Sequence, residues 1–463
     1  MITRKEADSI GTMEVPMKAY YGVQTLRAKK NFHITGRPLH PEFIKNLVRI
    51  KKAAAYTNMT AHILDEKIGN AIVKACDEII EGKLHSQFIV DAIQGGAGTS
   101  ANMNANEVIA NRAIEILGGE KGDYTIVHPN DHVNMAQSTN DVIPSAGKLT
   151  ILALLPGLLE QLERLHKALR DKSIEFDDVV KMGRTQLQDA VPIRLGQSFE
   201  AYAAVIERDI RRIRSLDSEI KVLNIGATAV GTAINVNPVY LFHIIRNVNL
   251  VCGTDCSQAE DLFDATQNLD GFVHTSAALR VCAVNLSKIC NDLRLLSSGP
   301  KAGLGEINLP PKQNGSSIMP GKINPVIPEV VSQVAYNVIG NDVTVTMAAE
   351  AGQLELNAFE PVIFYKIFES IDTLRGAVET LIDNCILGIT ANRERCRALV
   401  ESSAALATAL CPALGYKKSA EIAKKCNRTG IPVRQIVLEE GLLPEEELDR
   451  YLSLVDMTQA GHP

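Results

Sequence analysis

The chain has 463 residues, a formal net charge of −6 and 46% hydrophobic residues. This length allows two or three domains with a sizeable core, and the composition is ordinary for a soluble globular protein. A nucleic-acid-binding protein needs a basic face, so the acidic balance argues against nucleic acid as a partner.

The N-terminus and the cysteines indicate the compartment. The opening residues, MITRKEADSIGT, have no apolar run after the basic positions and do not form a secretory signal. Nine cysteines lie between Cys76 and Cys426 without paired spacing, and Cys252 and Cys256 have no second pair to complete a zinc site. We therefore expect reduced, mostly buried thiols in a cytoplasmic protein.

The first polar loop reads QGGAGTSANMNAN, residues 94–106. Its glycines lack G-x-G-x-x-G spacing and no clear strand precedes them, so the loop is a weak match to a dinucleotide fingerprint. Thr99, Ser100, Asn102 and Asn104 offer neutral donors that suit a carboxylate. A plain polar turn before a helix explains the segment equally well.

The second polar segment reads HPNDHVNMAQSTNDVIPSA, residues 128–146. Ser138, Thr139 and Asn140 precede a long apolar stretch, so one of them should be the N-cap of a helix. The unpaired N–H groups and the positive dipole end of that helix also suit an anion. His128 and His132 stand four apart, but the intervening Pro-Asn argues against a helical pair of metal ligands.

Long helices dominate the middle of the chain. Two apolar stripes alternate in steps of three and four: Leu155, Leu158, Leu162, Leu165 and Leu169, then Leu279, Cys282, Leu286, Ile289, Leu293 and Leu296. This spacing is typical of nearly parallel helices in a bundle, with partners in the same chain or in another subunit.

The limits of the other helices follow from similar signals. Further apolar helices are expected over residues 197–223 and 326–339, and the 279–296 helix should end at Ser297 to Pro300. The most apolar stretch, residues 149–159, is expected to be broken by Pro156 and is too short to span a membrane. Alternating strand and helix patterns are missing, which argues against a doubly wound α/β fold.

Two later loops carry further polar groups. GRTQLQDAVP, residues 183–192, holds Thr185 and Gln186 and reads as a polar connector. GSSIMPGKINP, residues 315–325, places Ser316 near Lys322, a cation that can hold a carboxylate. Ser316 becomes a usable base only if backbone donors and a cation stabilise its alkoxide. The absence of a G-x-S-x-G elbow argues against a Ser-His-Asp triad. Together, the four polar segments suit a small molecule with several carboxylates.

GSSIMPGKINP resembles the signature loop of the fumarase/aspartase superfamily. GGAGTSANMNANE, STND, GRTQLQDAVP and KICNDLRLLSSGP resemble the same superfamily in the expected order, from Ile10 to about Leu443. YYGVQTLRAKKNF, VIPE and EAGQLELN are most similar to its aspartase branch. Gln186 stands where fumarases carry a histidine, although some aspartases have histidine there too.

The resemblance implies a mainly α fold of three domains, here residues 1–139, 140–394 and 395–463. The central domain would be a bundle of long helices that assembles into a homotetramer, and each active site would combine loops from three subunits.

The resemblance also implies reversible deamination of L-aspartate to fumarate and ammonia through an enediolate. Ser316 would be the base, and Arg27 matches a position implicated in activity. Four residues would bind the β-carboxylate: Thr99, Ser138, Thr139 and Ser317. Three would bind the α-carboxylate: Thr185, Lys322 and Asn324. Asn140 and Gln186 would face the amino group. No redox or organic cofactor is implied, and activation by a divalent cation is left open.

Two alternatives remain at this stage. A class II fumarase, or a related carboxylate lyase that releases another amine, would use a similar site for different chemistry. A catalytically silent scaffold, as in lens proteins of this superfamily, is disfavoured because every polar residue named above is present.

Overall fold

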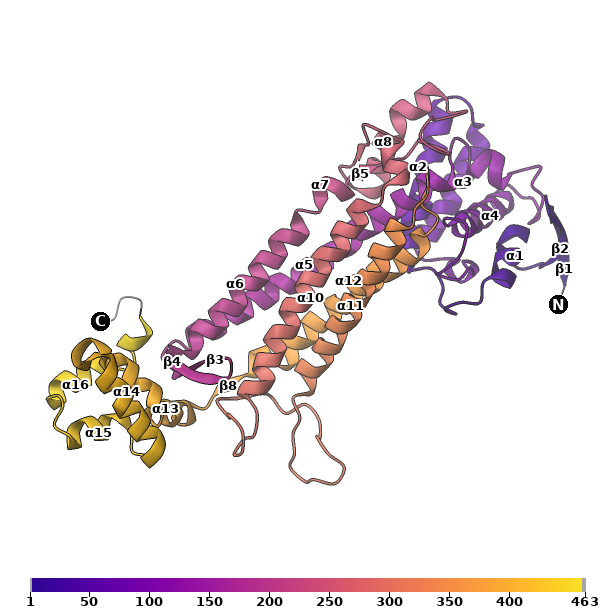
Figure 1. Cartoon of the computed structure of the whole chain (residues 1–463). Coiled ribbons are helices and arrows are strands. Elements are labelled where there is room, and N and C mark those ends of the chain that lie inside the picture. Colours follow the sequence, from indigo (N-terminus) through magenta and orange to yellow (C-terminus); the bar gives the residue numbers. More distant parts are fainter. Residues whose placement is uncertain (1, 460–463) are drawn as a thin grey trace. The chain divides into compact units, whose positions relative to one another are not determined.

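The computed structural model describes residues 2–459 and is mainly helical (Figure 1). The chain forms two compact units. Unit 1 comprises Met1–Leu158, Arg212–Arg280 and Asn337–Thr373, and unit 2 comprises Leu159–Arg211, Val281–Tyr336 and Leu374–Pro463. The predicted boundaries of three domains stay a prediction.

Unit 1 begins with an antiparallel hairpin of β1 (Thr3–Asp8) and β2 (Gly11–Pro16). Its shorter helices are α1 (Val23–Asn31), α2 (Pro41–Thr60), α3 (Glu66–Ile80), α4 (Thr99–Ile116) and α8 (Pro238–Cys252). Helix α2 packs against α3 and α8, and α3 packs against α4. Local caps fix the helix starts: Asp65 accepts the N–H groups of Lys67 and Ile68 at 2.9 and 3.1 Å.

The middle of the chain forms five long helices, and the two predicted stripes lie on the first and third of them (Figure 1). The five helices are α5 (Thr139–Glu175), α6 (Leu195–Arg214), α10 (Asp270–Leu296), α11 (Val326–Glu350) and α12 (Glu360–Asn384). Every member of both apolar stripes is buried. Helix α10 ends at Leu296, which confirms the predicted stop before Ser297.

The predicted break at Pro156 is wrong, because α5 continues through both Pro144 and Pro156. A proline removes one backbone hydrogen bond, and burial of the leucines on both sides of Pro156 outweighs that loss. Among the described residues, α5 is the single unbent helix long and apolar enough to cross a membrane. However, 61% of its most apolar window is buried within the structure, as in a bundle core.

Two other predicted helix limits also differ. The helix expected over residues 197–223 ends at Arg214, where the Ser215 hydroxyl donates to the Arg212 carbonyl at 2.7 Å and competes with the helical pattern. The short α7 (Asp217–Ile220) and β5 (Val222–Leu223) follow, and β5 pairs in parallel with β6 (Ser257–Gln258). A further short helix, α9, spans Asp264–Gln267. The helix expected over residues 326–339 extends to Glu350.

Unit 2 contains two small sheets and the C-terminal helices. Strands β3 (Val180–Thr185) and β4 (Gln188–Arg194) form an antiparallel hairpin, and β7 (Ile307–Asn308) pairs with β8 (Thr390–Ala391). The helices are α13 (Arg393–Glu401), α14 (Cys411–Thr429), α15 (Val433–Glu439) and α16 (Glu445–Tyr451). Met182 of the hairpin packs into their apolar core. Pro444 directly precedes α16 as its N-cap residue.

Candidate active site

The predicted site residues divide between the two units. Unit 1 carries Arg27, Thr99, Ser138, Thr139 and Asn140, and unit 2 carries Thr185, Gln186, Ser316, Ser317, Lys322 and Asn324. Each group is therefore described within its own unit.

In unit 1, the N-termini of α4 and α5 meet. Thr99 and Thr139 are the first residues of the two helices, and the Thr99 hydroxyl donates to the Thr139 Oγ1 at 3.3 Å. Gly98 allows this approach, because its φ is 85° and a Cβ there would lie 2.9 Å from Cγ2 of Ile143. The positive dipole ends of two helices converge here, an arrangement that suits an anion.

Ser138 is the N-cap of α5, which confirms the prediction that one of residues 138–140 caps this helix. Its Oγ accepts the N–H of Asn140 at 3.2 Å, and Oδ1 of Asp141 accepts the N–H of Ser138 at 2.9 Å. The other Asp141 oxygen accepts the N–H groups of Gly226 and Thr228, each at 3.1 Å. Burial raises the pKa of Asp141 to about 6. This buried carboxylate ties the start of α5 to the loop at residues 224–233.

Asn140 also forms hydrogen bonds with the same loop. Its Nδ2 donates to the Ala229 carbonyl at 2.7 Å, and its own carbonyl accepts Nδ2 of Asn224 at 3.0 Å. The side-chain oxygen of Asn140 is then the atom suited to face an ammonium group. The contact of the 224–233 loop with the start of α5 was not predicted, although the run of Gly, Ala and Thr in this loop indicates an irregular segment.

A buried lysine lies beneath the two helix starts and was also missed. Lys51 of α2 is 0% exposed, and its Nζ donates to Oδ1 of Asn134 at 2.8 Å. The same oxygen accepts Nδ2 of Asn102 at 3.2 Å, and this Nδ2 lies 3.3 Å from Oγ1 of Thr139. The only signal in the sequence is a lysine pair inside an apolar helix, which usually lies on the solvent face.

Burial lowers the pKa of Lys51 to about 7, from an ordinary value of 10.5. Between these two values the unfolded chain binds more protons at this lysine, so its contribution to stability increases as the pH rises. We expect the free energy of unfolding to rise, relative to Lys51→Met, by up to about 1.4 kcal/mol per pH unit across this window. Denaturant unfolding from about pH 7.5 to about pH 9.5 measures the difference.

Lys52→Met is the matched control. Lys52 is partly exposed and pairs with Asp77 at 2.6 Å, and this pairing raises its pKa despite opposing desolvation. Its removal should therefore leave the slope across the same window in place. Equal slopes for wild type and Lys51→Met would contradict the burial of an uncharged lysine.

Arg27 lies on α1 and binds the turn of the N-terminal hairpin. Its Nε and Nη2 donate to the two oxygens of Asp8 at 3.0 and 2.8 Å, and this pairing lowers the pKa of Asp8. Arg27 also lines a cavity of about 540 Å³ with Gly95 and Ser100 of the first polar loop. The structure thus brings Arg27 near that loop but gives it no link to Thr99.

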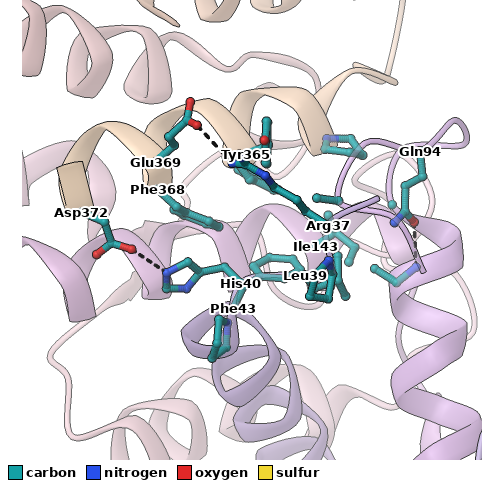
Figure 2. Close-up of a pocket in the computed structure, with 17 residues that line it drawn as sticks. Arg37, Leu39, His40, Phe43, Gln94, Ile143, Tyr365, Phe368, Glu369 and Asp372 are labelled. Atoms are coloured by element: carbon teal, nitrogen blue, oxygen red, sulfur yellow. Dashed lines mark hydrogen bonds and ion pairs between the residues drawn. The ribbon is translucent and has the colours of Figure 1, made fainter. Parts of the chain in front are cut away.

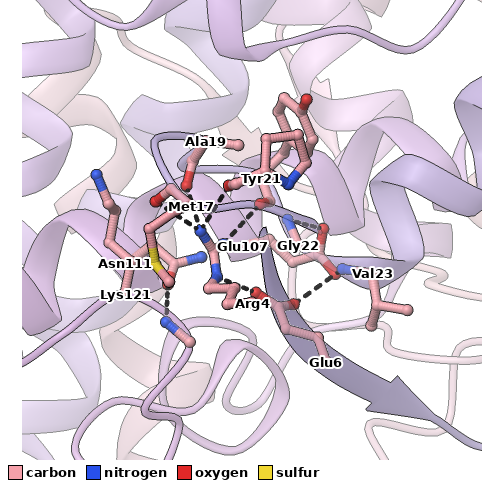
Figure 3. A network of polar contacts seen from close by, with 12 residues as sticks. Arg4, Glu6, Met17, Ala19, Tyr21, Gly22, Val23, Glu107, Asn111 and Lys121 are labelled. Atoms are coloured by element: carbon pink, nitrogen blue, oxygen red, sulfur yellow. Dashed lines mark hydrogen bonds and ion pairs between the residues drawn. The ribbon is translucent and has the colours of Figure 1, made fainter. Parts of the chain in front are cut away.

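The start of α1 is held by a buried carboxylate (Figure 3). Glu107 of α4 accepts the N–H groups of Gly22, Gln24 and Thr25 at 2.8 to 3.1 Å. Burial raises the pKa of Glu107 against these hydrogen bonds. A Cβ on Gly22 would lie 2.6 Å from Oε2 of Glu6, so only glycine fits. This network fixes the helix that carries Arg27.

An apolar cavity of about 380 Å³ lies beside the start of α4 (Figure 2). Phe43, Ile143 and Phe368 contribute to its wall, and so does Gly98, the residue before Thr99 in the sequence. Its charged groups are paired: Nε2 of His40 lies 2.9 Å from Asp372, and Arg37 lies 3.5 Å from Glu369. This cavity contains none of the predicted site residues.

In unit 2, Thr185 and Gln186 lie at the tip of the β3–β4 hairpin. Thr185 pairs with Gln188, and the two residues between them have positive φ, 54° at Gln186 and 63° at Leu187. This is a type I′ turn, which normally favours Asn-Gly. Both Thr185 and Gln186 are exposed in the single chain. The segment expected as a polar connector is therefore a strained hairpin.

The Ser316 loop is closed at its base. The N–H of Gly315 donates to the Lys322 carbonyl at 2.8 Å, and Nδ2 of Asn324 donates to the Gly315 carbonyl at 2.8 Å. A Cβ on Gly315 would lie 2.5 Å from the Lys322 carbonyl oxygen, so this contact requires glycine. Ser317 and Lys322 are exposed on the loop. Asn324 thus holds the loop together with its amide nitrogen.

The Ser316 hydroxyl lies next to backbone donors, which it needs in order to act as a base. Its Oγ accepts the backbone N–H groups of Ile318 at 3.2 Å and Met319 at 3.0 Å. Two N–H groups aimed at one oxygen favour its negatively charged form. In residues 2–459, no group of three or more His, Cys, Asp or Glu side chains could hold a metal ion.

The comparisons with known proteins define the class. The family model described as "Lyase" matches residues 11–340, and the model described as "Fumarase C C-terminus" matches residues 406–459. The chain belongs to the fumarase/aspartase superfamily of lyases. A curated relative, the aspartate ammonia-lyase of Bacillus subtilis (strain 168), is 53% identical over 458 residues, which are 99% of this chain and 96% of that protein.

Two solved structures share the fold. The fumarate lyase:delta crystallin from Brucella melitensis bound to cobalt has a TM-score of 0.96 and 51% identity, covering 99% of this chain and 100% of that chain. The class II fumarase from Schistosoma mansoni has a TM-score of 0.95 and 34% identity, with the same coverage. These matches confirm the predicted mainly α, fumarase/aspartase-type fold.

Proposed function

We propose that the protein is an aspartate ammonia-lyase, which converts L-aspartate reversibly into fumarate and ammonia. The observation that carries the proposal is the Ser316 loop, where two backbone N–H groups point at a serine oxygen and Lys322 lies on the same loop. The relatives named aspartate ammonia-lyase are also more similar to this chain than the fumarase is, so the fumarase alternative is disfavoured.

The difficult step is removal of a weakly acidic proton from the carbon next to the β-carboxylate. Ser316, as an alkoxide stabilised by the N–H groups of Ile318 and Met319, takes this proton. The electron pair moves onto the β-carboxylate to form an enediolate. It then returns to form the carbon–carbon double bond as the carbon–nitrogen bond breaks and ammonia leaves.

The β-carboxylate binds where the starts of α4 and α5 meet. Thr99, Ser138, Thr139 and the loop residue Ser317 surround it with neutral donors, and the two helix dipoles stabilise the second charge of the enediolate. Buried Lys51 adds positive potential behind Thr139 whenever it is protonated. These donors stabilise the enediolate, and the transition state that leads to it, more than the substrate, because the second charge develops only as the proton leaves.

The α-carboxylate of aspartate binds to groups from unit 2. Lys322, Thr185 and Asn324 hold the α-carboxylate, with the ammonium of Lys322 as a point charge. Gln186 and the side-chain oxygen of Asn140 face the amino group. Deamination moves protons and an electron pair without oxidation, so this mechanism uses no redox or organic cofactor.

The site is completed by self-association into a tetramer. One face of α11 carries Tyr336, Gly340, Val343 and Met347 at helical spacing, and the three side chains are 56% to 67% exposed. A Cβ at Gly340 would have no neighbour within 4 Å, so this face is open in the single chain. An exposed apolar stripe of this kind packs on a helix of another subunit. The exposed tip of the β3–β4 hairpin then reaches the substrate site of another subunit.

The proposal is tested by incubating the purified protein with L-aspartate and, separately, with L-malate. Aspartate should give fumarate absorbance and an equal amount of ammonia, and malate should give almost no fumarate. Comparable turnover of malate would overturn the assignment and leave only the superfamily.

A further inference from the structure

A buried carboxylate in unit 2 binds the hairpin that carries Thr185 and Gln186. Glu306 is 0% exposed, and its Oε1 lies 2.9 Å from Nη1 of Arg184, one residue before Thr185. Its Oε2 lies 3.3 Å from Nζ of Lys181 on the same strand. Both cations are largely buried, with side chains 14% and 5% exposed. A fully buried carboxylate between two largely buried cations forms a tight cluster.

The backbone of Glu306 is itself fixed. Its N–H donates to the Leu296 carbonyl at the end of α10, and its carbonyl accepts the N–H of Asn392 just before α13, both at 2.9 Å. The carboxylate therefore projects from a rigid point of unit 2 toward the hairpin.

The β3–β4 hairpin has a bulge next to the two cations. Side chains three residues apart in a regular strand point to opposite faces. The hairpin departs from a regular ladder, because Ala190 and Val191 of β4 both lie opposite Gly183 of β3, and both Lys181 and Arg184 reach Glu306. The bulge requires glycine, because a Cβ on Gly183 would lie 2.7 Å from the Val191 carbonyl oxygen. Gly183 and Arg184, the two residues before Thr185, therefore fix the hairpin at the bulge and at the carboxylate.

The geometry points to Glu306 as a positioning residue for the substrate-binding hairpin. Its carboxylate holds Arg184 inward, and since neighbouring side chains on a strand alternate, this directs Thr185 outward and orients the strained turn at Gln186. This inference rests on the proposed function, because it assigns the hairpin to the substrate's α-carboxylate and amino group.

The main test is Arg184→Met, with Arg184→Lys and Gly183→Ala beside it. Arg184→Met removes the contact next to Thr185 but leaves Lys181 and Glu306 as a balanced pair, whereas Glu306→Gln would leave two buried cations without a carboxylate. The KM for aspartate should rise about tenfold or more in Arg184→Met, with a smaller fall in kcat. Arg184→Lys should recover part of the loss, and Gly183→Ala should raise KM as well.

Arg393→Met is the matched control, because Arg393 makes an exposed ion pair with Asp178 in the same unit. It should leave both kinetic constants unchanged. Partial unfolding lowers the apparent kcat but not KM, so a purely structural role gives an unchanged KM. An unchanged KM in Arg184→Met and Gly183→Ala would therefore overturn the inference.

Calorimetric titration with fumarate separates this inference from the proposed function. It measures the dissociation constant of a dicarboxylate without turnover, and the constant should rise in Arg184→Met but not in Arg393→Met. If the wild-type protein binds fumarate but does not deaminate aspartate, the proposed function is wrong. The positioning role of Glu306 is then still tested by the dissociation constants for fumarate. Equal dissociation constants in wild type and Arg184→Met, or no fumarate binding by wild type, would count against the positioning role.

Discussion

Ser316→Ala is expected to lower kcat for aspartate by about three orders of magnitude or more, the scale for loss of a positioned base and its partner interactions. The substitution removes the oxygen at which the N–H groups of Ile318 and Met319 point. Helix content and assembly should not change, because the loop is irregular and lies outside the buried stripes. Steady-state kinetics, circular dichroism and native mass measure these quantities.

Ser218→Ala is the control for this substitution. Ser218 is an exposed serine of α7 whose hydroxyl donates to the Ser215 carbonyl, so its removal should leave kcat unchanged. Near-normal turnover in Ser316→Ala would show that another group takes the proton.

Mixing two inactive variants is expected to restore about a quarter of wild-type activity. If a site combines Ser316 of one chain with Thr185 of another, a Ser316→Ala chain still supplies Thr185, and a Thr185→Val chain still supplies Ser316. After the two are unfolded, mixed equally and refolded, random closed assembly makes about a quarter of the sites intact.

Each variant refolded alone sets the floor of this experiment, and wild type refolded in parallel sets the ceiling. If one chain supplied both residues of a site, no mixed tetramer would contain an intact site. Activity at the floor, with mixed tetramers verified by mass, would therefore refute shared sites.

The long-helix architecture was predictable because its signal is local. The stripes at 155–169 and 279–296 repeat every three or four residues, and each member is buried. Helix limits were less predictable. Pro156 normally breaks a helix, but α5 contains it because burial of the leucines around it outweighs one lost hydrogen bond.

The polar loops were predictable as a set, but their internal geometry was not. The N-cap at Ser138 follows from local residue types, and the two donors to Ser316 depend only on a short turn. The β3–β4 hairpin, which contains residues 183–192, was not predicted. A bulge interrupts its strand pattern, and its turn contains no glycine.

Contacts between residues distant in the sequence could not be predicted. Lys51 meets Asn134 across 83 residues, and Arg184 meets Glu306 across 122. In a single sequence, each looks like an ordinary polar residue. Only the fold reveals that Lys51 and Glu306 are fully buried near predicted substrate-binding groups.

The most direct measurement of the central claim is a competition between ammonia and water for fumarate. The purified protein is incubated with fumarate and ammonium in aqueous buffer, and the products are followed by proton NMR. An aspartate ammonia-lyase should form L-aspartate and almost no malate, although water is in large excess. Malate as the main product, or no product with folded protein, would contradict the assignment.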